Sequence, residues 1–421
     1  MNARPAAVRF IFVTVVLDVV AMGIIIPVLP HLIEDLLRGD AVRAASYYGI
    51  FATVWAMMQF VCSPIIGMLS DRFGRRRVLL LSNFGLGLDY IVMALAPTIG
   101  WLFVGRVISG ITGASWTTAG AYIADVTPRE ERAAGFGILG AAFGLGFVLG
   151  PALGGILGGV DPRLPFWVAG SLTLVNAAWG VFVLPESLQS DQRRPFDWRR
   201  ANPVGALKLL RSHHELLGLA TVGFIWLIAH NVMPSVFVLY ASEAFAWGPR
   251  AVGLALAVVG VATMIVQGGL VRRIVPKIGE RRARLAGLAF GSVNYFIWGL
   301  APTGAIGLLA IPVGAMMGLY NPAAQSIMSH RVSPSEQGQL QGANSSIMGI
   351  TGMIAPPLFT QVFAKFIDTD GVRFPGAPLI LAGLLGLTAL VLAERVTRGR
   401  AGMPPGHESH ASPADTPAGS P

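Results

Sequence analysis

Long apolar runs, each broken by charged residues, proline or glycine, dominate the sequence. An α-helix needs about 20 apolar residues to cross the hydrocarbon core of a bilayer. Twelve runs have about that length, and they predict spans at 9–30, 46–70, 78–97, 100–124, 134–159, 164–184, 215–241, 251–275, 283–301, 304–328, 339–366 and 374–394. The pattern therefore predicts an all-α integral membrane protein with twelve transmembrane helices.

The first apolar run, Phe10–Leu29, follows Arg4 and Arg9 in the manner of a signal peptide. It is too long for one, it contains Asp18, and no small-residue cleavage site follows it. We interpret it as a retained first helix.

Composition excludes an ordinary soluble protein. Of 421 residues, 53% are hydrophobic and 13% are charged, whereas soluble domains carry about 25% charged residues. A net charge of +9 would suggest nucleic acid in a soluble protein, but here the placement of the charge matters more, and we expect no nucleic-acid partner. Cys62 is the one cysteine, so no intrachain disulfide can form. The sequence has no nucleotide-binding loop, HExxH or GxSxG motif, which argues against an enzyme.

The basic residues lie mostly on one side of the predicted membrane. Of 31 Lys and Arg, 24 fall in the N-terminal segment, the loops that follow even-numbered spans and the C-terminal tail, and six fall in the other loops. Arg106 falls inside a span. By the positive-inside rule, both termini are predicted to be cytoplasmic.

An internal repeat divides the chain. The segment Gly74–Thr98 recurs at Gly279–Thr303 with a constant offset of 205 residues. We predict an N-terminal six-helix bundle at 1–184, a basic cytoplasmic linker at 185–214, a C-terminal six-helix bundle at 215–394 and a disordered cytoplasmic tail at 395–421. Such halves typically bracket a binding site at the bilayer midplane and rock around it.

Two motifs resemble those of the major facilitator superfamily. The segment GMLSDRFGRR, between helices 2 and 3, supplies Gly67, Asp71, Arg72, Gly74, Arg75 and Arg76. Helix 5 carries a motif typical of the proton-coupled antiporters of that superfamily: Gly137, Gly146, Gly150, Pro151, Gly154 and Gly155. We predict gating or conformational roles for both sets.

Further stretches resemble the tetracycline/proton antiporters. They are Leu17-Asp18 with MGIIIPVLP, MMQFVCSP, LDY around Asp89, GRVISGITGA around Arg106, LPES at 184–187 and QGQLQG at 337–342. The resemblance implies proton-coupled efflux of a planar drug and antibiotic resistance, in a monomer of the bacterial plasma membrane. It implies no cofactor, although the substrate can be a magnesium-chelated tetracycline.

The resemblance also assigns importance to single positions: Asp18, Gln59, Asp89, Arg106 and Gln267. Two positions depart from the family. Thr263 stands where the Gram-negative antiporters have a histidine in helix 8, and Gly291 stands where they have an aspartate in helix 9. The C-terminal spans contain no deep acid, so a transported proton would bind to an acidic residue of the N-terminal half.

Three charges inside lipid support this assignment. Asp18, Asp89 and Arg106 each cost about 2.5–3.5 kcal/mol at a span centre on insertion scales. At 1.5 Å of helix rise per residue, all three lie near mid-membrane, and Asp89 and Arg106 differ in depth by about 3 Å. A structural ion pair is the alternative to our hypothesis that Asp18 or Asp89 exchanges a proton for substrate.

The two motifs have simpler interpretations as well. The helix-5 glycines suit a surface that re-packs between states, although static close packing gives the same pattern. Arg75 and Arg76 can serve as positive-inside anchors, whereas the carboxylate of Asp71 adds nothing to anchoring. We expect Asp71 to pair across the cytoplasmic face and to hold the two halves together in one state.

Polar residues of the C-terminal spans are candidate substrate contacts: His230, Asn231, Gln325 and Asn344. Each alternatively packs or bonds a helix. Trp55, Trp116 and Trp226 can stack on a planar ligand, although Trp is also common at membrane interfaces. Two rival functions stay open: an exporter of another drug or metabolite, which Thr263 and Gly291 favour, and a non-transporting sensor or scaffold.

Overall fold

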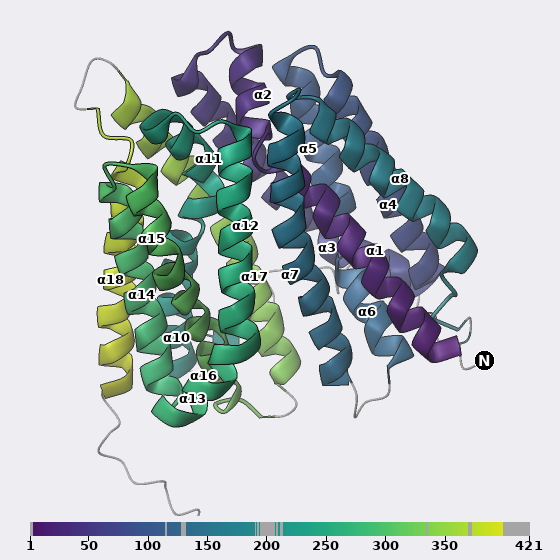
Figure 1. Ribbon diagram of the computed structural model, residues 1–421. Coiled ribbons are helices and arrows are strands. Elements are labelled where there is room, and N and C mark those ends of the chain that lie inside the picture. Colours follow the sequence, from purple (N-terminus) through teal and green to yellow (C-terminus); the bar gives the residue numbers. More distant parts are fainter. Residues whose placement is uncertain are drawn as a thin grey trace, which may run out of the picture.

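A computed structural model describes residues 3–113, 116–127, 132–189, 191, 193, 207, 209–210, 214–333, 336–368 and 373–398. For residues 3–11, 116–117, 132–139, 214–215 and 397–398 it describes the backbone alone. All the regular elements in these ranges are helical (Figure 1). Ten helical stretches of the described chain are long and apolar enough to cross a membrane, so the protein is a multi-pass membrane protein.

The N-terminal half holds the first six spans. In order they are α1 (Ala3–Ile25) with α2 (Leu29–Leu36), α3 (Ala41–Phe73), α4 (Arg75–Leu95), α5 (Ile99–Gly113) with α6 (Trp116–Val126), α7 (Arg132–Gly158) and α8 (Leu164–Val183).

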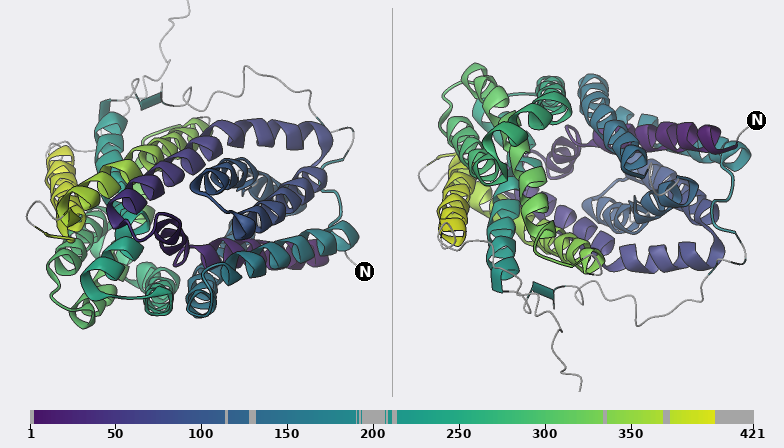
Figure 2. Two further views of the ribbon diagram at one scale, coloured as in Figure 1. Left: turned by 90° about the horizontal axis from the view of Figure 1, so that it is seen from above. Right: turned by 90° about the horizontal axis from the view of Figure 1, so that it is seen from below.

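The C-terminal half holds the other six. They are α10 (His214–His230) with α11 (Val232–Phe245), α12 (Pro249–Ile265) with the π-helix η5 (Val266–Leu270) and α13 (Val271–Ile278), α14 (Glu280–Leu300), α15 (Gly304–Ala315) with the 3-10 turn η6 (Met316–Leu319) and α16 (Tyr320–Ser329), α17 (Gln337–Ile367) and α18 (Ala377–Arg398). Viewed along the helices, the two halves lie side by side (Figure 2).

Two of the twelve spans fall outside the ten apolar stretches. One is α5 with α6, which is interrupted at residues 114–115, outside the described chain. The other is α14, whose first turns contain Glu280, Arg281, Arg282 and Arg284. The charge on α14 lowers its hydropathy although its length is that of a span.

Equivalent glycines turn the chain in both halves. Gly74, with φ +102°, separates α3 from α4, and Gly279, with φ +79°, separates α13 from α14. Only glycine adopts such a φ without a steric penalty. The two positions are the first residues of the sequence repeat, so the repeat is also a repeat of backbone conformation.

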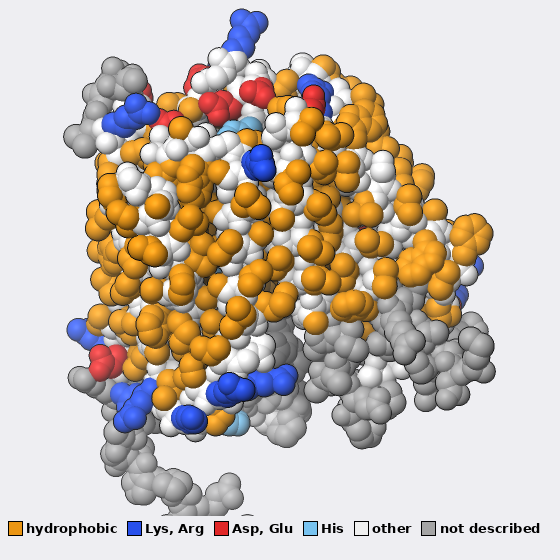
Figure 3. Space-filling view, viewed as in Figure 1, with side chains coloured by type: hydrophobic (Ala, Val, Ile, Leu, Met, Phe, Trp, Pro, Cys, Tyr) orange, Lys and Arg blue, Asp and Glu red, His pale blue; other side chains and the backbone are white. Residues whose placement is uncertain are grey.

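Charge distinguishes the two ends of the bundle. The basic end is the one at which α3 meets α4 and α13 meets α14, and the opposite end is the one at which α2 meets α3 and α11 meets α12. Figure 3 shows a hydrophobic band between them, with blue Lys and Arg side chains gathered near α13 and red acidic side chains gathered at the opposite end.

The halves contact each other toward the opposite end. A Cβ added to Gly155 of α7 would lie 2.9 Å from Cα of Gly253 on α12, and Thr53 of α3 donates to the carbonyl of Met353 on α17 at 3.3 Å. Gly67, nearer the basic end of α3, has no neighbour within 4 Å of an added Cβ. The contacts of Gly155 and Thr53 thus hold the two halves together toward the opposite end.

Two sequence-based boundaries need correction. The first span does not end near residue 30, because α2 continues it to Leu36 after a turn at 26–28. Arg395–Arg398, placed in a disordered tail, extend α18. Residues 399–421 and most of the linker lie outside the described residues. Of the linker's described part, Leu209 and Leu210 are buried against α10, α16 and α17.

Candidate functional site

Asp18 lies in the middle of α1 and is partly buried. Its Oδ1 accepts a hydrogen bond of 2.9 Å from Nδ2 of Asn176 on α8. Asn176 is 1% exposed, and the same amide also donates to the carbonyl of Thr14 at 3.2 Å. Asn83 of α4 lies close enough to the Asp18 carboxyl to interact with it. The carboxyl of Asp18 is thus held by amides rather than by a cation.

Asp89 lies on α4 and is 1% exposed. By hydrogen-bond geometry neither of its carboxyl oxygens is bonded among the described residues, although the Ser109 hydroxyl of α5 lies close enough to interact with the carboxyl. The next helix passes very close, since a Cβ added to Gly105 of α5 would lie 3.0 Å from Oδ1 of Asp89. A buried, unpartnered carboxyl is unusual in a folded protein, and such groups call for a functional explanation.

Arg106 lies on α5, one residue after this close contact, and Nη2 of its guanidinium is 2.9 Å from Sδ of Met93. Within the described residues Arg106 forms no ion pair with Asp89 at the 4.0 Å limit. The pair that the depth estimate allows is therefore not formed in this state. This weighs against a purely structural ion pair.

Two tyrosines that the sequence analysis passed over connect these groups. Tyr90, 3% exposed on α4, lies within electrostatic reach of Asp18, Asp89 and Arg106. Tyr48 of α3 lies near Arg106 and donates from its hydroxyl to the carbonyl of Pro234 on α11 at 3.2 Å. The structure therefore brings the three predicted proton-coupling residues together around Tyr90, and Tyr48 links them to the other half.

The sequence could have singled out Tyr90, because this residue belongs to the LDY triplet and recurs as Tyr295 in the repeat. The sequence did not single out Asn176 or Tyr48, because their hydrogen-bond partners lie 158 and 186 residues away in the chain.

The two predicted glutamines lie on separate helices. Gln59 of α3 packs against α5, where its Nε2 would lie 2.8 Å from a Cβ on Gly113. Gln267 is exposed in η5, and its Cγ would lie 3.3 Å from a Cβ on Gly318 of η6. Single π turns often mark functional sites. Each glutamine is thus placed at an irregular or closely packed point of a span.

The seventh span breaks between α10 and α11, at His230 and Asn231. Oη of Tyr295 lies 3.4 Å from Nδ1 of His230, and the residue is solvent-accessible although it lies deep in the bundle among neighbouring groups. Nδ2 of Asn231 donates to the carbonyl of Leu227 at 2.7 Å. His230 therefore keeps an accessible ring for a ligand, while the Asn231 amide bonds its own helix.

The remaining predicted contacts bind each other. Nδ2 of Asn344 on α17 donates to Oε1 of Gln325 on α16 at 3.0 Å. Both residues are partly buried. The pair joins two spans and leaves one amide nitrogen and one amide oxygen for other partners.

Gly291 of α14, one of the two positions noted as departing from the resembled family, faces the ring of Trp226. An added Cβ there would collide with that indole. Trp226 in turn packs against Tyr320, with ring centroids 5.4 Å apart, and against Tyr295 at 6.2 Å. An aromatic cluster thus occupies the space where a side chain at position 291 would project. Thr263 is partly exposed on α12.

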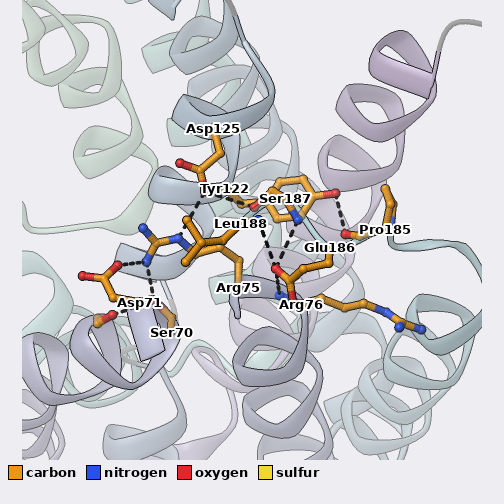
Figure 4. A network of polar contacts seen from close by, with 11 residues as sticks. Ser70, Asp71, Arg75, Arg76, Tyr122, Asp125, Pro185, Glu186, Ser187 and Leu188 are labelled. Carbon is orange, nitrogen blue, oxygen red and sulfur yellow. Dashed lines mark hydrogen bonds and ion pairs between the residues drawn. The ribbon is translucent and has the colours of Figure 1, made fainter. Parts of the chain in front are cut away.

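The loop motif forms a network at the basic end (Figure 4). Arg75 pairs with Asp71, with Ser70 at 2.6 Å and with Asp125 of α6 at 3.2 Å. Among the residues that the structure describes, the predicted pairing of Asp71 across the two halves is not seen in this state. Its partner is Arg75 of the same half, four residues further along the chain.

The LPES segment, residues 184–187, forms hydrogen bonds within the same network. The Glu186 carboxylate accepts from the backbone N–H of Arg76 at 3.3 Å, and it also contacts Gly74, where an added Cβ would collide with it. Carboxylates are favoured at a helix N-terminus such as that of α4. Ser187 donates to Asp125 at 3.0 Å. By contrast, Arg72 is exposed, with its guanidinium 5.1 Å from the centre of the Phe73 ring.

The glycine motif of the fifth predicted span lies in α7 and contacts two different neighbours. Gly146, Gly150 and Gly154 approach α1 so closely that an added Cβ would clash with Val19, Gly23 or Ile24 respectively. Pro151 is buried beside Gly23, and Gly155 faces α12 of the other half, as already described. Gly137 lies in α7, but its surroundings fall outside the described residues. The Trp116 side chain is likewise not described, and Trp55 lies beside Gly110.

No group of three His, Cys, Asp or Glu among the described residues could hold a metal ion.

Comparison with known proteins gives the family. The family model described as the Major Facilitator Superfamily matches residues 11–356. Tetracycline resistance protein, class C, from Escherichia coli is 36% identical over 376 residues, which cover 89% of this chain and 94% of that protein. Tetracycline resistance protein, class G, from Vibrio anguillarum is 35% identical over 381 residues, which cover 90% and 95%.

Solved structures show the same fold. A bacterial homolog of the human lysosomal transporter Spinster matches with a TM-score of 0.77 at 16% identity, over 94% of this chain and 98% of that one. The human organic anion transporter matches with a TM-score of 0.69 at 22% identity, over 93% and 100%.

These similarities cover the two halves together and confirm the predicted twelve-helix layout. They also confirm that the protein is a transporter and not an enzyme. By sequence and by fold, the chain belongs to the major facilitator superfamily, within its family of tetracycline resistance proteins.

Proposed function

We propose that the protein exports a tetracycline-like drug in exchange for protons by alternating access. Curated relatives that are more than 30% identical over most of the chain are named tetracycline resistance proteins. Asp18, Asp89 and Arg106 are the proposed proton-coupling residues. The bacterial inner membrane is the proposed location.

The observation that carries the proposal is the state of Asp89. This carboxyl is buried in a span, forms no hydrogen bond of ordinary geometry among the described residues, and lies within electrostatic reach of Arg106, with which it does not pair. An ionised carboxylate is costly to bury without a partner, so proton binding there is favourable. When Arg106 approaches Asp89 in another state, the ion pair favours release of the proton. A change of state then moves a proton.

We propose that the basic end faces the cytoplasm, together with both termini. The excess of Lys and Arg at that end supports this orientation. Because the contacts of Gly155 and Thr53 between the halves lie toward the opposite end, the conformation would then face inward. Drug would enter from the cytoplasmic side and leave after the halves rock.

The proposed drug site lies between the halves. His230 presents an exposed ring beside the aromatic cluster of Trp226 and Tyr295, which can stack on a planar ligand. Gln59, Gln267, Asn231 and the Gln325–Asn344 pair complete the proposed polar contacts. Magnesium would travel as part of the chelated drug, with no cofactor held by the protein, and the transporter would act as a monomer.

Tetracycline uptake into everted membrane vesicles under an imposed pH gradient tests the function. Wild-type vesicles should accumulate drug only with the gradient, and Asp18→Asn or Asp89→Asn should abolish accumulation. Drug/drug exchange without a gradient serves as the control that the variants still bind and move the drug. Gradient-driven uptake by both variants would overturn the assignment of the proton-coupling residues.

A different drug is the second candidate, and the contact between Gly291 and Trp226 favours it. The family's helix-9 acid is absent here, and an indole ring covers that position. The drug pocket therefore differs from that of the Gram-negative antiporters where they carry a charge. Susceptibility of cells to a panel of drugs decides this, since resistance to other drugs without tetracycline resistance would favour the second candidate.

A further inference from the structure

One buried amide combines two features that the proton-coupling scheme does not use. Asn176 of α8 is 1% exposed and donates from Nδ2 to Oδ1 of Asp18 and to the carbonyl of Thr14. Its own Oδ1 is buried and has no hydrogen-bond partner among the described residues. A buried acceptor without a donor is destabilising, so such an atom needs an explanation.

The protonation chemistry of Asp18 explains why the Asn176 oxygen is left without a donor. An ionised carboxylate only accepts hydrogen bonds, whereas a protonated carboxyl also has an O–H to donate. An amide offers donors on its nitrogen and an acceptor on its oxygen. Asn176 can therefore donate to Asp18 when the carboxylate is ionised and accept from it when the carboxyl is protonated. The unpartnered Oδ1 is the acceptor that the second state requires.

We propose that Asn176 is a positioning residue that holds the Asp18 carboxyl in both of its protonation states. The inference rests on the proposed function of Asp18 in proton coupling. Asn83 of α4, 3% exposed, faces the same carboxyl and would act as the second amide. Asp18 is then a point at which α1, α4 and α8 meet through polar groups that respond to a proton.

The position of Asp18 on α1 links a change in its protonation to the contact between the two halves. α1 carries Asp18, and the α1 residues Val19, Gly23 and Ile24 pack against the α7 glycines. α7 continues to Gly155, which contacts Gly253 of the other half. A change in how Asn176 holds Asp18 therefore acts on the helix that packs against this contact between the halves.

Few other charges act on Asp18. The sequence of α8 contains no ionisable residue, and the described side chains of α7, from Gly140 onward, include none. On α4, Tyr90 faces Asp18, with Asp89 and Arg106 within reach of the same tyrosine. Tyr122 and Asp125 of α6 belong to the network at the basic end. The two amides are thus the nearest polar groups that hold the carboxyl.

The test is an infrared titration of the purified transporter without drug. The carbonyl band of protonated Asp18 is identified by its loss in Asp18→Asn, and its midpoint and frequency are then measured in Asn176→Leu. Leucine has the branched shape of asparagine, but it is larger and has no polar atoms. We expect the carbonyl band of protonated Asp18 to shift, because the carboxyl loses its hydrogen bond to the Asn176 amide. The midpoint should move only as far as that amide holds one protonation state more strongly than the other, and a tenfold imbalance would be about one pH unit.

Thr173→Val is the matched control. Thr173 lies one turn earlier on α8, is fully buried, and its hydroxyl has no hydrogen-bond partner among the described residues. It should leave midpoint and frequency unchanged. If Asn176→Leu fails to fold, Asn176→Ala replaces it, because the smaller side chain cannot overpack the site. An unchanged midpoint and band in a folded Asn176 variant overturns the inference.

Because no drug is present, this result is independent of the transported substrate. Failure of tetracycline uptake by the wild type would overturn the proposed drug and leave the titration meaningful. A normal titration in Asn176→Leu together with normal wild-type uptake would overturn the positioning role alone. As a second readout, Asn176→Leu should lower gradient-driven uptake more than drug/drug exchange, whereas Thr173→Val should lower neither.

Discussion

The two halves share an equivalent backbone arrangement, but they carry different side chains at equivalent positions. With the repeat offset of 205, Asp89 and Tyr90 of α4 correspond to Asn294 and Tyr295 of α14. Asp89 packs against Gly105 of the following helix, and Asn294 packs against Gly314 of the helix that follows α14. The N-terminal half thus holds an acid where the C-terminal half holds a neutral amide of the same shape.

The tyrosines differ in the same way. Tyr90 lies among Asp18, Asp89 and Arg106, whereas Tyr295 contacts His230 and Trp226. The comparison teaches that the repeat conserves close packing while the side chains have diverged. One half is charged at mid-membrane and suits protons, and the other is aromatic and amide-rich and suits an organic ligand.

The largest expected effect comes from making the two halves alike. Asp89→Asn copies Asn294 and should fold normally, because the same amide already fits the equivalent site. Gradient-driven drug uptake in vesicles should fall to background, since no proton can bind there. The reciprocal Asn294→Asp, combined with Asp89→Asn, should not restore it, because Arg106 belongs to the other half. Restored uptake would show that the position of the acid is not decisive.

The contact between the halves should give the next largest effect. Gly155→Leu should lower transport by an order of magnitude or more, because backbones that nearly touch cannot accommodate a side chain. Uptake rate and thermal stability of the purified protein measure this. Gly140→Ala on the same helix is the control, because an added Cβ there has no neighbour within 4 Å. Equal effects of the two substitutions would contradict a role for the close contact.

The aromatic cluster should respond through stability. Gly291→Ala forces a methyl group against the indole of Trp226, and overpacking of this kind costs about 1–3 kcal/mol. The melting temperature in detergent should fall. Gly223→Ala is matched to it, because the added Cβ would lie 3.5 Å from Oη of Tyr320, an ordinary contact. A stable Gly291→Ala protein would show that Trp226 can move aside.

The smallest effect is expected for the Gln325–Asn344 pair. A double-mutant cycle with Gln325→Leu and Asn344→Leu should give a coupling energy of about 0.6 kcal/mol, the average for hydrogen bonds between membrane helices. The free energy of unfolding is the quantity to measure. If these amides instead contact the drug, drug affinity should change in the single variants with little coupling in stability.

Several features could be predicted from the sequence because they depend on local pattern. Apolar runs of span length predict the helices, since unsatisfied backbone groups are too costly in lipid. The constant repeat offset predicts equivalent glycine turns, and the structure has them at Gly74 and Gly279. The deep positions of Asp18, Asp89 and Arg106 could be found as well, because charges are rare inside spans.

Other features depended on contacts between distant segments. The sequence did not reveal the break at Asn231 or the π turn around Gln267, because packing of neighbouring spans decides where a helix becomes irregular. It allowed an Asp89–Arg106 pair, but depth along the membrane does not determine the direction in which a side chain points.

By itself, then, the sequence determined the membrane, the twelve spans, the two related halves and the three charges at mid-membrane. These follow from hydropathy and from repetition along the chain. Only the tertiary structure decided that Asn176 holds Asp18, that Asp89 forms no ion pair with Arg106 among the described residues, and that Trp226 covers Gly291. Each of these depends on how neighbouring helices pack, and small residues set how closely the helices approach.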